Sequence, residues 1–125
     1  MSITKPLQEA GLDEGTELSD FFENAPIGML WIAADGTVLK ANQYKLDMLG
    51  YKESEFVGHN IAEFHPDKDN LDKALTTIAG GGVLQNYPVG LTCKDGSVKR
   101  LLLNSNGRFA DGQLVHTRCV TRPAE

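Results

Sequence analysis

Residues that could do chemistry are few in this 125-residue sequence, and they lie far apart. Cys93 and Cys119 form no CxxC motif, and two cysteines do not make a disulfide framework. We interpret both as reduced, buried thiols of a cytosolic domain. The three histidines are scattered and have no carboxylate cluster beside them, so the sequence predicts no metal site.

Glu63 and His65 are close in sequence and could act as an acid and a base. Such pairs arise often by chance, and the sequence contains no GxSxG, HExxH, P-loop or Rossmann motif. The glycine run at 80–82 follows a predicted helix, so it cannot present helix N-terminal amides to a phosphate. We therefore predict that the domain is not an enzyme.

The composition is that of a globular domain, with 41% hydrophobic and 23% charged residues. Seventeen acidic residues against 12 basic ones give a formal net charge of −5, which argues against nucleic-acid binding. The sequence has no apolar run of the roughly 20 residues that a transmembrane helix needs. Its first residues are not those of a signal peptide. We expect a single cytoplasmic domain, with no membrane insertion of this segment.

Asp-Gly turns and hydrophobic spacing predict the elements that position these residues. Three Asp-Gly pairs, each flanked by apolar runs, predict β-hairpins. Apolar residues three and four apart predict short helices in the middle of the chain, followed by a longer helix at about 66–79. A further helix begins at Thr16 or Ser19 and ends before Pro26. The predicted strands are 28–33, 37–42, 84–93, 97–108 and 113–121.

Strands at both ends of the chain with helices between them predict an α+β domain. In such a domain an antiparallel sheet carries the helices on one face. Pro88 cannot donate a backbone hydrogen bond, so its strand is expected at an edge or with a bulge. Residues 1–15 show little periodicity and are expected to form an N-terminal lead-in or linker.

In this order the segments resemble a PAS domain of the sensory-box type, found in bacterial signalling proteins such as sensor histidine kinases. The family's opening hairpin resembles FFENAPIGMLWIAADGTVLKAN (21–42), and its central helices resemble LDMLGYKESEFVGHNIAEFHPD (46–67). Its last three strands are similar to LTCKDGSVKRLLLNSNGRFADGQLVHTRCVTR (91–122). The resemblance covers about 19–121 and implies a five-stranded antiparallel sheet of order 2-1-5-4-3, with short helices on one face.

The resemblance also implies a function in signal transduction, for example in a two-component system. We expect the PAS domain at 16–122, and an exit toward a probable effector at 123–125. The first hypothesis is a sensor that detects a small ligand or a partner and relays the signal to a fused or partner effector. That effector could be a histidine kinase. The alternative is a ligand-free protein-interaction or homodimerisation domain.

A ligand would lie between the central helices and the inner face of the sheet. Apolar helix faces provide the expected helix wall, which consists of Tyr44, Met48, Phe56, Ile61, Phe64 and Leu75. The strands offer Trp31, Leu91, Leu102 and Asn104. Alternation along 98–106 leaves open which side chains point inward. The competing interpretation is that all these residues fill a core and leave no room for a ligand.

The resemblance guides the choice of cofactor. Flavin-binding light sensors of the family carry a reactive cysteine in a segment comparable to 58–64, which here has none. Haem sensors use a histidine on the long helix, and that helix here has none. His65, just before it, is the only weak candidate ligand for haem. We expect neither haem nor flavin, no covalently bound cofactor, and a colourless protein.

Two further surfaces follow from the resemblance. Carboxylate-sensing relatives need cations that face the ligand, and the candidates here are Lys99, Arg100, Arg108 and Arg118. Their alternative role is that of solvated residues on a sheet face. Homodimers of the family often pack through the exposed sheet face and the N-terminal helix. The candidate interface residues are Leu18, Phe21 and Phe22, which could instead cover their own sheet.

Overall fold

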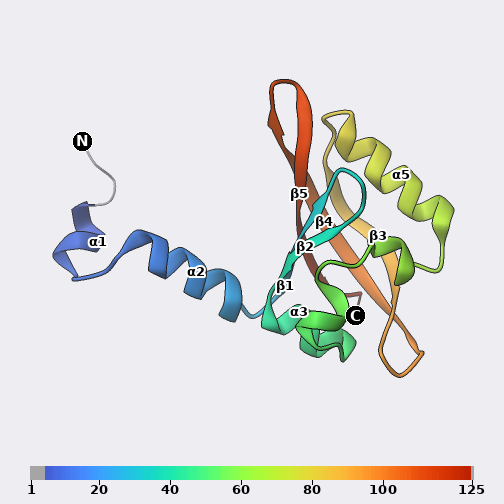
Figure 1. Ribbon diagram of the computed structural model, residues 1–125, viewed down its shortest axis with the longest axis horizontal. Helices are drawn as coiled ribbons and strands as arrows, with labels where there is room; N and C mark the ends of the chain where they lie inside the picture. The colour runs from blue at the N-terminus through green and yellow to red at the C-terminus, as the bar shows by residue number, and fades with distance from the viewer. Residues whose placement is uncertain (1–4, 125) are drawn as a thin grey trace.

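The structure of the protein is a computed structural model that describes residues 5–124. A five-stranded sheet forms its centre, and α5 runs along one face (Figure 1). The elements in chain order are α1 (Lys5–Glu9), α2 (Glu14–Asn24), β1 (Gly28–Ala33), β2 (Val38–Ala41), α3 (Gln43–Leu49), α4 (Glu53–Phe56), the 3-10 helix η1 (Ile61–Glu63), α5 (Lys68–Ala79), β3 (Leu84–Thr92), β4 (Val98–Ala110) and β5 (Gln113–Pro123).

The strand order is β2-β1-β5-β4-β3, and every neighbouring pair is antiparallel. The predicted α+β fold and strand order are therefore confirmed. Each Asp-Gly pair occupies a turn, and at the β4–β5 turn Asp111 and Gly112 have φ values of 52° and 76°. Positive φ at both central residues matches the right-handed twist of the strands, which explains the glycine. Pro88 lies in β3, an edge strand, as expected.

Side-chain alternation gives the sheet two different faces. On β4, Leu101 and Ser105 are buried toward the helices, whereas Asn104 lies on the other face. The inward set of β4 is paired in register with that of β5, where Ser105 is opposite Cys119. The hydrophobic core thus lies between this inner face and the helices α3 to α5.

Asn42 fixes α3 against the sheet and so determines where the side chains of that helix lie. Its side chain is fully buried and accepts hydrogen bonds from the backbone N–H of Lys45 and of Met29, both at 3.0 Å. Its amide nitrogen donates to the Ile27 carbonyl at 2.9 Å. The predicted N-cap is confirmed, and it also ties the start of α3 to β1.

Helix α2 begins at Glu14, slightly before the predicted start, because Asp13 is the N-cap and accepts a 2.9 Å hydrogen bond from the Thr16 backbone. It extends away from the sheet together with α1 (Figure 1). Helix α5, in contrast, starts two residues after its predicted position, with Asp67 as N-cap. Within residues 5–124 no helix combines the length and the apolar character needed to cross a bilayer.

Candidate functional site

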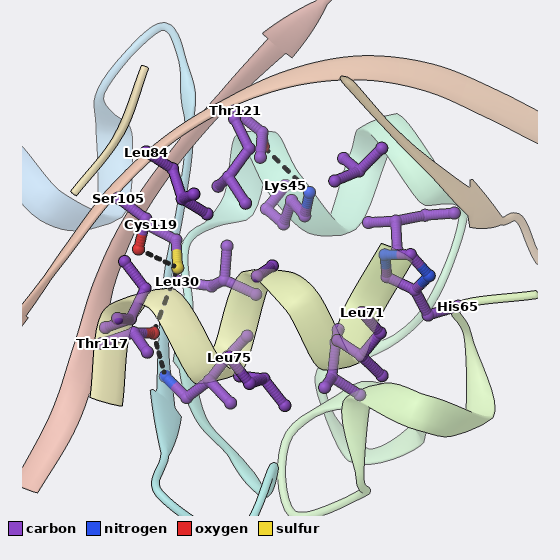
Figure 2. A pocket seen from close by; sticks show the side chains of 17 residues that line it. Leu30, Lys45, His65, Leu71, Leu75, Leu84, Ser105, Thr117, Cys119 and Thr121 are labelled. Carbon is purple, nitrogen blue, oxygen red and sulfur yellow. Dashed lines mark hydrogen bonds between the residues drawn. The ribbon is translucent and has the colours of Figure 1, made fainter. Parts of the chain in front are cut away.

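A cavity of about 50 Å³ lies between the inner face of the sheet and the helices α3, η1 and α5 (Figure 2). One water molecule needs roughly 10–15 Å³ on such a measure, so the cavity accommodates a few waters or one small molecule. Its walls are mainly aliphatic, with Leu71, Leu75 and Ile78 from α5 facing Leu30 and Ile32 of β1. Such a wall with few polar groups is typical of a small-molecule site.

Lys45 brings a positive charge into this cavity. The residue is 0% exposed, and its Nζ donates a 2.9 Å hydrogen bond to Thr121 Oγ1. Burial lowers the pKa of this ammonium to about 8, an effect that Cys119 and Cys93 oppose. A group with that pKa is still protonated in roughly nine molecules of ten at pH 7. The cavity therefore contains a buried cation.

Gly28 leaves the space that Lys45 and Thr121 occupy. A Cβ atom at this glycine would lie 2.7 Å from Thr121 Oγ1 and 3.2 Å from Lys45 Cδ. Because the first distance is shorter than real Cβ contacts, the hydrogen-bonded pair requires glycine at the start of β1. Three elements, β1, α3 and β5, thus cooperate to hold the ammonium in place.

His65, between η1 and α5, adds a second polar group to the cavity wall. It is 3% exposed, and neither ring nitrogen has a hydrogen-bond partner among the described residues. Burial lowers the pKa of the imidazole, against an opposing effect of the Asp67 backbone and carboxylate nearby, and so favours the neutral ring. Figure 2 shows its ring and the Lys45 side chain directed into the same cavity. Buried polar groups normally have partners, so this histidine is an exception that needs an explanation.

The floor of the cavity is a polar strip whose members are already paired. Cys119 Sγ lies 3.1 Å from both Ser105 Oγ and Thr117 Oγ1, and the Ile32 backbone N–H donates to Thr117 Oγ1 at 3.2 Å. Burial raises the pKa of the Cys119 thiol, which is therefore no nucleophile at pH 7. Cys93 is also a buried free thiol, as predicted. No cluster of potential metal ligands occurs in the described part of the chain.

The helix residues proposed from the sequence fall into three groups. Ile61 and Leu75 line the cavity. Phe56 and Phe64 are buried beside it, with ring centroids 4.8 Å apart, in an aromatic cluster with Tyr51. Tyr44 is 39% exposed, and Met48 packs against the core without lining the cavity. Only part of the expected helix wall therefore faces the space that could hold a ligand.

Among the strand candidates, Leu91 lines the cavity, whereas Trp31, Leu102 and Asn104 do not. These three lie on the outer face, because the alternate residues of β1 and β4 point toward the helices. The four proposed cations are all exposed and line no part of the cavity: Lys99, Arg100, Arg108 and Arg118.

Sequence reasoning missed Lys45 as a residue of the cavity wall, and it considered His65 as a ligand for haem or as an acid–base group rather than as part of that wall. A signal for the lysine was present, because Lys45 and Leu49 are four residues apart and share one face of α3. Leu49 is buried, so Lys45 points the same way. The three inward β5 residues, Thr117, Cys119 and Thr121, could have been found by their period of two.

The proposed dimer residues lie around a groove between α2 and the outer face of the sheet. Leu18 and Phe21 are 63% and 59% exposed. Phe22 instead covers its own sheet, with its ring centroid 5.5 Å from that of Trp31 and Lys40 Nζ 5.0 Å above it. The apolar stripe formed by Leu18, Phe21 and Phe22 on α2 thus has two parts. Phe22 makes an intramolecular contact, whereas Leu18 and Phe21 form an exposed apolar surface.

Solved structures with similar folds come from several organisms. The PAS domain of an HTR-like protein from Haloarcula marismortui is 26% identical, with a TM-score of 0.75 over 95% of both chains. A domain of the sensory box sensor histidine kinase/response regulator from Geobacter sulfurreducens is 21% identical, with a TM-score of 0.74. The match covers 95% of this chain and 98% of that one.

A more distant structure is Drosophila melanogaster Cycle PAS-B with bound ethylene glycol, 14% identical with a TM-score of 0.70. The match covers 77% of this chain and 98% of the Drosophila chain. No curated protein matches the sequence significantly. The sequence profile of the PAS domain matches residues 26–122, well over half of the chain. The chain therefore belongs to the PAS domain family.

Proposed function

We propose that this PAS domain is a sensory input module that binds a small ligand in its cavity and relays binding to a signalling effector. A fused or partner histidine kinase is one such effector. The observation that carries the proposal is the cavity itself, with apolar walls and two buried polar groups, Lys45 and His65. Its volume of about 50 Å³ favours a small molecule over haem or flavin.

Two neighbours support this function. The Geobacter sulfurreducens structure is a domain of a sensor histidine kinase/response regulator. The Drosophila Cycle PAS-B structure holds ethylene glycol, a molecule of the size that fits here. A cytoplasmic location agrees with two free, buried cysteines.

The relay that we propose runs through β5. Thr121, the partner of Lys45, lies two residues before the end of that strand at Pro123. A ligand that accepts the hydrogen bond of Lys45 Nζ would break its bond to Thr121 and change the packing at the end of β5. Arg118 and Val120, the outward neighbours, line the groove beside α2, so the change would also reach the outer face. We take residues 16–122 as the signalling unit, preceded by a lead-in at 1–15 and followed by an exit at 123–125.

A cavity-filling variant tests ligand binding. Ala74 lines the cavity and is buried on α5, whereas Ala79 is exposed on the same helix. A fragment library of small molecules is titrated into methyl-labelled protein, and the methyl signals of Leu71, Leu75 and Ile78 are followed by NMR. We expect ligands to shift these signals in the wild type and in Ala79→Leu, but not in Ala74→Leu. Absence of any shift in the wild type, or binding that survives in Ala74→Leu, would contradict the proposal.

The exposed apolar stripe of α2 favours homodimerisation as a second candidate function. Leu18 and Phe21 have no intramolecular cover comparable to that of Phe22 among the described residues. Sedimentation velocity over a range of concentrations measures the oligomeric state. We expect self-association in the wild type and its loss in Phe21→Asp. Val98→Asp, which changes an equally exposed residue away from this groove, is expected to keep it. A monomeric wild type would exclude this function for the isolated domain.

A further inference from the structure

Lys45 has more hydrogen-bonding capacity than the fold uses. An ammonium group has three N–H donors. Among residues 5–124, Thr121 Oγ1 is its one hydrogen-bond acceptor, and that oxygen is uncharged. No aspartate or glutamate of the described chain lines the cavity. A buried charge is expected to be paired, because desolvation otherwise costs several kcal/mol. The described residues that line the cavity therefore provide no counter-ion for this lysine.

His65 offers the complementary capacity on another part of the same wall. A neutral imidazole carries one N–H donor and one acceptor nitrogen. Both are buried and make no hydrogen bond of normal geometry within the described residues, although the Asp67 backbone lies close enough to act on the pKa of the ring, so the ring is available to a ligand atom. The hydroxyl and thiol groups of Ser105, Thr117 and Cys119 already contact one another, which leaves Lys45, His65 and the O–H of Thr121 as the available donors.

We infer that the cavity takes a short-chain monocarboxylate, whose carboxylate is held by Lys45 Nζ and the His65 ring and whose alkyl tail packs against α5. This inference rests on the proposed ligand-binding function and specifies its ligand. The carboxylate supplies the missing counter-ion and accepts the free N–H groups. Leu71, Leu75 and Ile78 receive the apolar tail, which explains why one charged group sits in an otherwise aliphatic cavity.

Size and charge restrict the ligand further. A volume of about 50 Å³ limits the molecule to a few non-hydrogen atoms. A second carboxylate would find no second cation among the described residues that line the cavity. A neutral molecule would leave Lys45 as an unpaired buried charge. Each methylene added to a tail that still fits is expected to strengthen binding roughly fourfold, until the cavity is full.

The test compares propionate with propionamide, an uncharged molecule of nearly the same shape, by NMR titration of the full chain. We expect propionate to bind at least about tenfold more tightly, the effect of 1.4 kcal/mol. In Lys45→Met the two ligands should bind within about twofold of each other. Lys52→Met removes the same charge from an exposed position and should keep the preference for propionate. Methionine replaces the lysine side chain up to Cε and lacks only the charged Nζ, so the variant is expected to retain the packing of α3.

His65→Phe provides an independent measurement, because it removes the ring nitrogens and leaves Lys45 in place. We expect propionate affinity to fall by about three- to tenfold while propionamide affinity changes less. Equal binding of the two ligands by the wild type, or a propionate preference that survives in Lys45→Met, would overturn the inference and leave the ligand-binding function intact. Failure of propionate, propionamide and the whole fragment library to bind would overturn both.

Discussion

The cations on the inner and outer faces of the sheet differ in their exposure to water and in their hydrogen-bond partners. On the outer face Arg118 donates to Asn106 Oδ1 at 2.9 Å and to the Gly107 carbonyl at 3.0 Å, and Arg122 donates to Asn86 Oδ1 at 2.7 Å. These guanidinium groups are also exposed to water. On the inner face Lys45 is fully buried with one neutral partner. The buried cation thus has neither water nor a charged group of the described chain as a partner.

This contrast indicates which part of the fold lowers the stability of the domain. An exposed cation costs little wherever it is placed, whereas a buried one without a counter-ion is destabilising. Positions that break a general rule of folding without local compensation are concentrated at functional sites. The contrast between the two faces therefore supports the proposed role of the inner face around Lys45, and it indicates structural roles for the outer-face arginines.

The largest effect is expected in the aromatic part of the inner face, which is fully packed. Phe56 is 0% exposed, stacks on Tyr51 and packs at a tilt against Phe64. Phe56→Ala should lower the free energy of unfolding by about 3–5 kcal/mol, through lost burial and a new cavity. Chemical denaturation measures this loss. A loss below about 1 kcal/mol would mean that this region is not packed as the structure shows.

Lys45→Met should change stability in the opposite direction. The pKa of Lys45 falls from 10.5 to about 8 on folding, so the buried charge costs up to about 3 kcal/mol at pH 7. Removing it should stabilise the protein by about 1–3 kcal/mol, because the lost hydrogen bond to Thr121 offsets part of the gain. Lys52→Met should change stability by less than about 0.5 kcal/mol.

The stability difference between Lys45→Met and the wild type should depend on pH. Between pH 8 and 10.5 the unfolded chain holds its proton on Lys45 and the folded chain does not. Wild-type stability therefore gains from rising pH in this window, and the advantage of Lys45→Met shrinks and is lost above it. The measurement is a set of denaturation curves of both proteins at several pH values. Subtracting the two free energies of unfolding at each pH removes the contribution of Cys119, which is common to both proteins. A constant difference would contradict a buried charged lysine.

Leu75→Ala separates the cavity from the packed core. Leu75 borders a space that is already open, so its truncation should cost about 2 kcal/mol, at or below the lower limit for core leucines. The same change should alter ligand affinity, because it enlarges the pocket beside the alkyl tail. A loss near 5 kcal/mol without any change in ligand binding would favour the interpretation of this region as core alone.

The smallest effect is expected for the outer face. Arg118→Gln removes an exposed charge whose hydrogen bonds compete with water, and should cost no more than about 1 kcal/mol. It should leave propionate affinity unchanged, since Arg118 does not line the cavity. Thermal denaturation and the NMR titration measure the two properties. A large effect on affinity would show that the two faces are more strongly coupled than proposed.

Much of the fold could be predicted from local signals. The Asp-Gly turns fix the hairpins because only a few residues tolerate their backbone angles. Asn42 marks the start of α3 because its side chain satisfies a free backbone N–H. These signals depend on a few neighbouring residues, and the sequence shows them directly.

Which residues line the cavity depends on contacts between segments that are far apart in the sequence. On β4 both sets of alternate residues mix apolar and polar types, so pairing with β5 decides that Leu101 and Ser105 face inward. The spacing to Leu49 indicates which way Lys45 points, but lysines are mostly exposed, so this spacing alone does not predict burial. The burial of Lys45 follows from the position of Thr121, 76 residues later in the chain, and from the space left by Gly28. Neither can be inferred from neighbours along the chain.

The most direct test of the account is the titration of Lys45 itself. NMR of ¹³Cε-labelled lysine, assigned with Lys45→Met, follows the protonation of this one side chain in the absence and presence of saturating propionate. We expect an apparent pKa of about 8 for Lys45 in the free protein and a higher pKa with propionate, because an anion that binds the ammonium must favour its protonated form. An unchanged Lys45 pKa at saturating propionate, or a value near the usual 10.5 in the free protein, would contradict it.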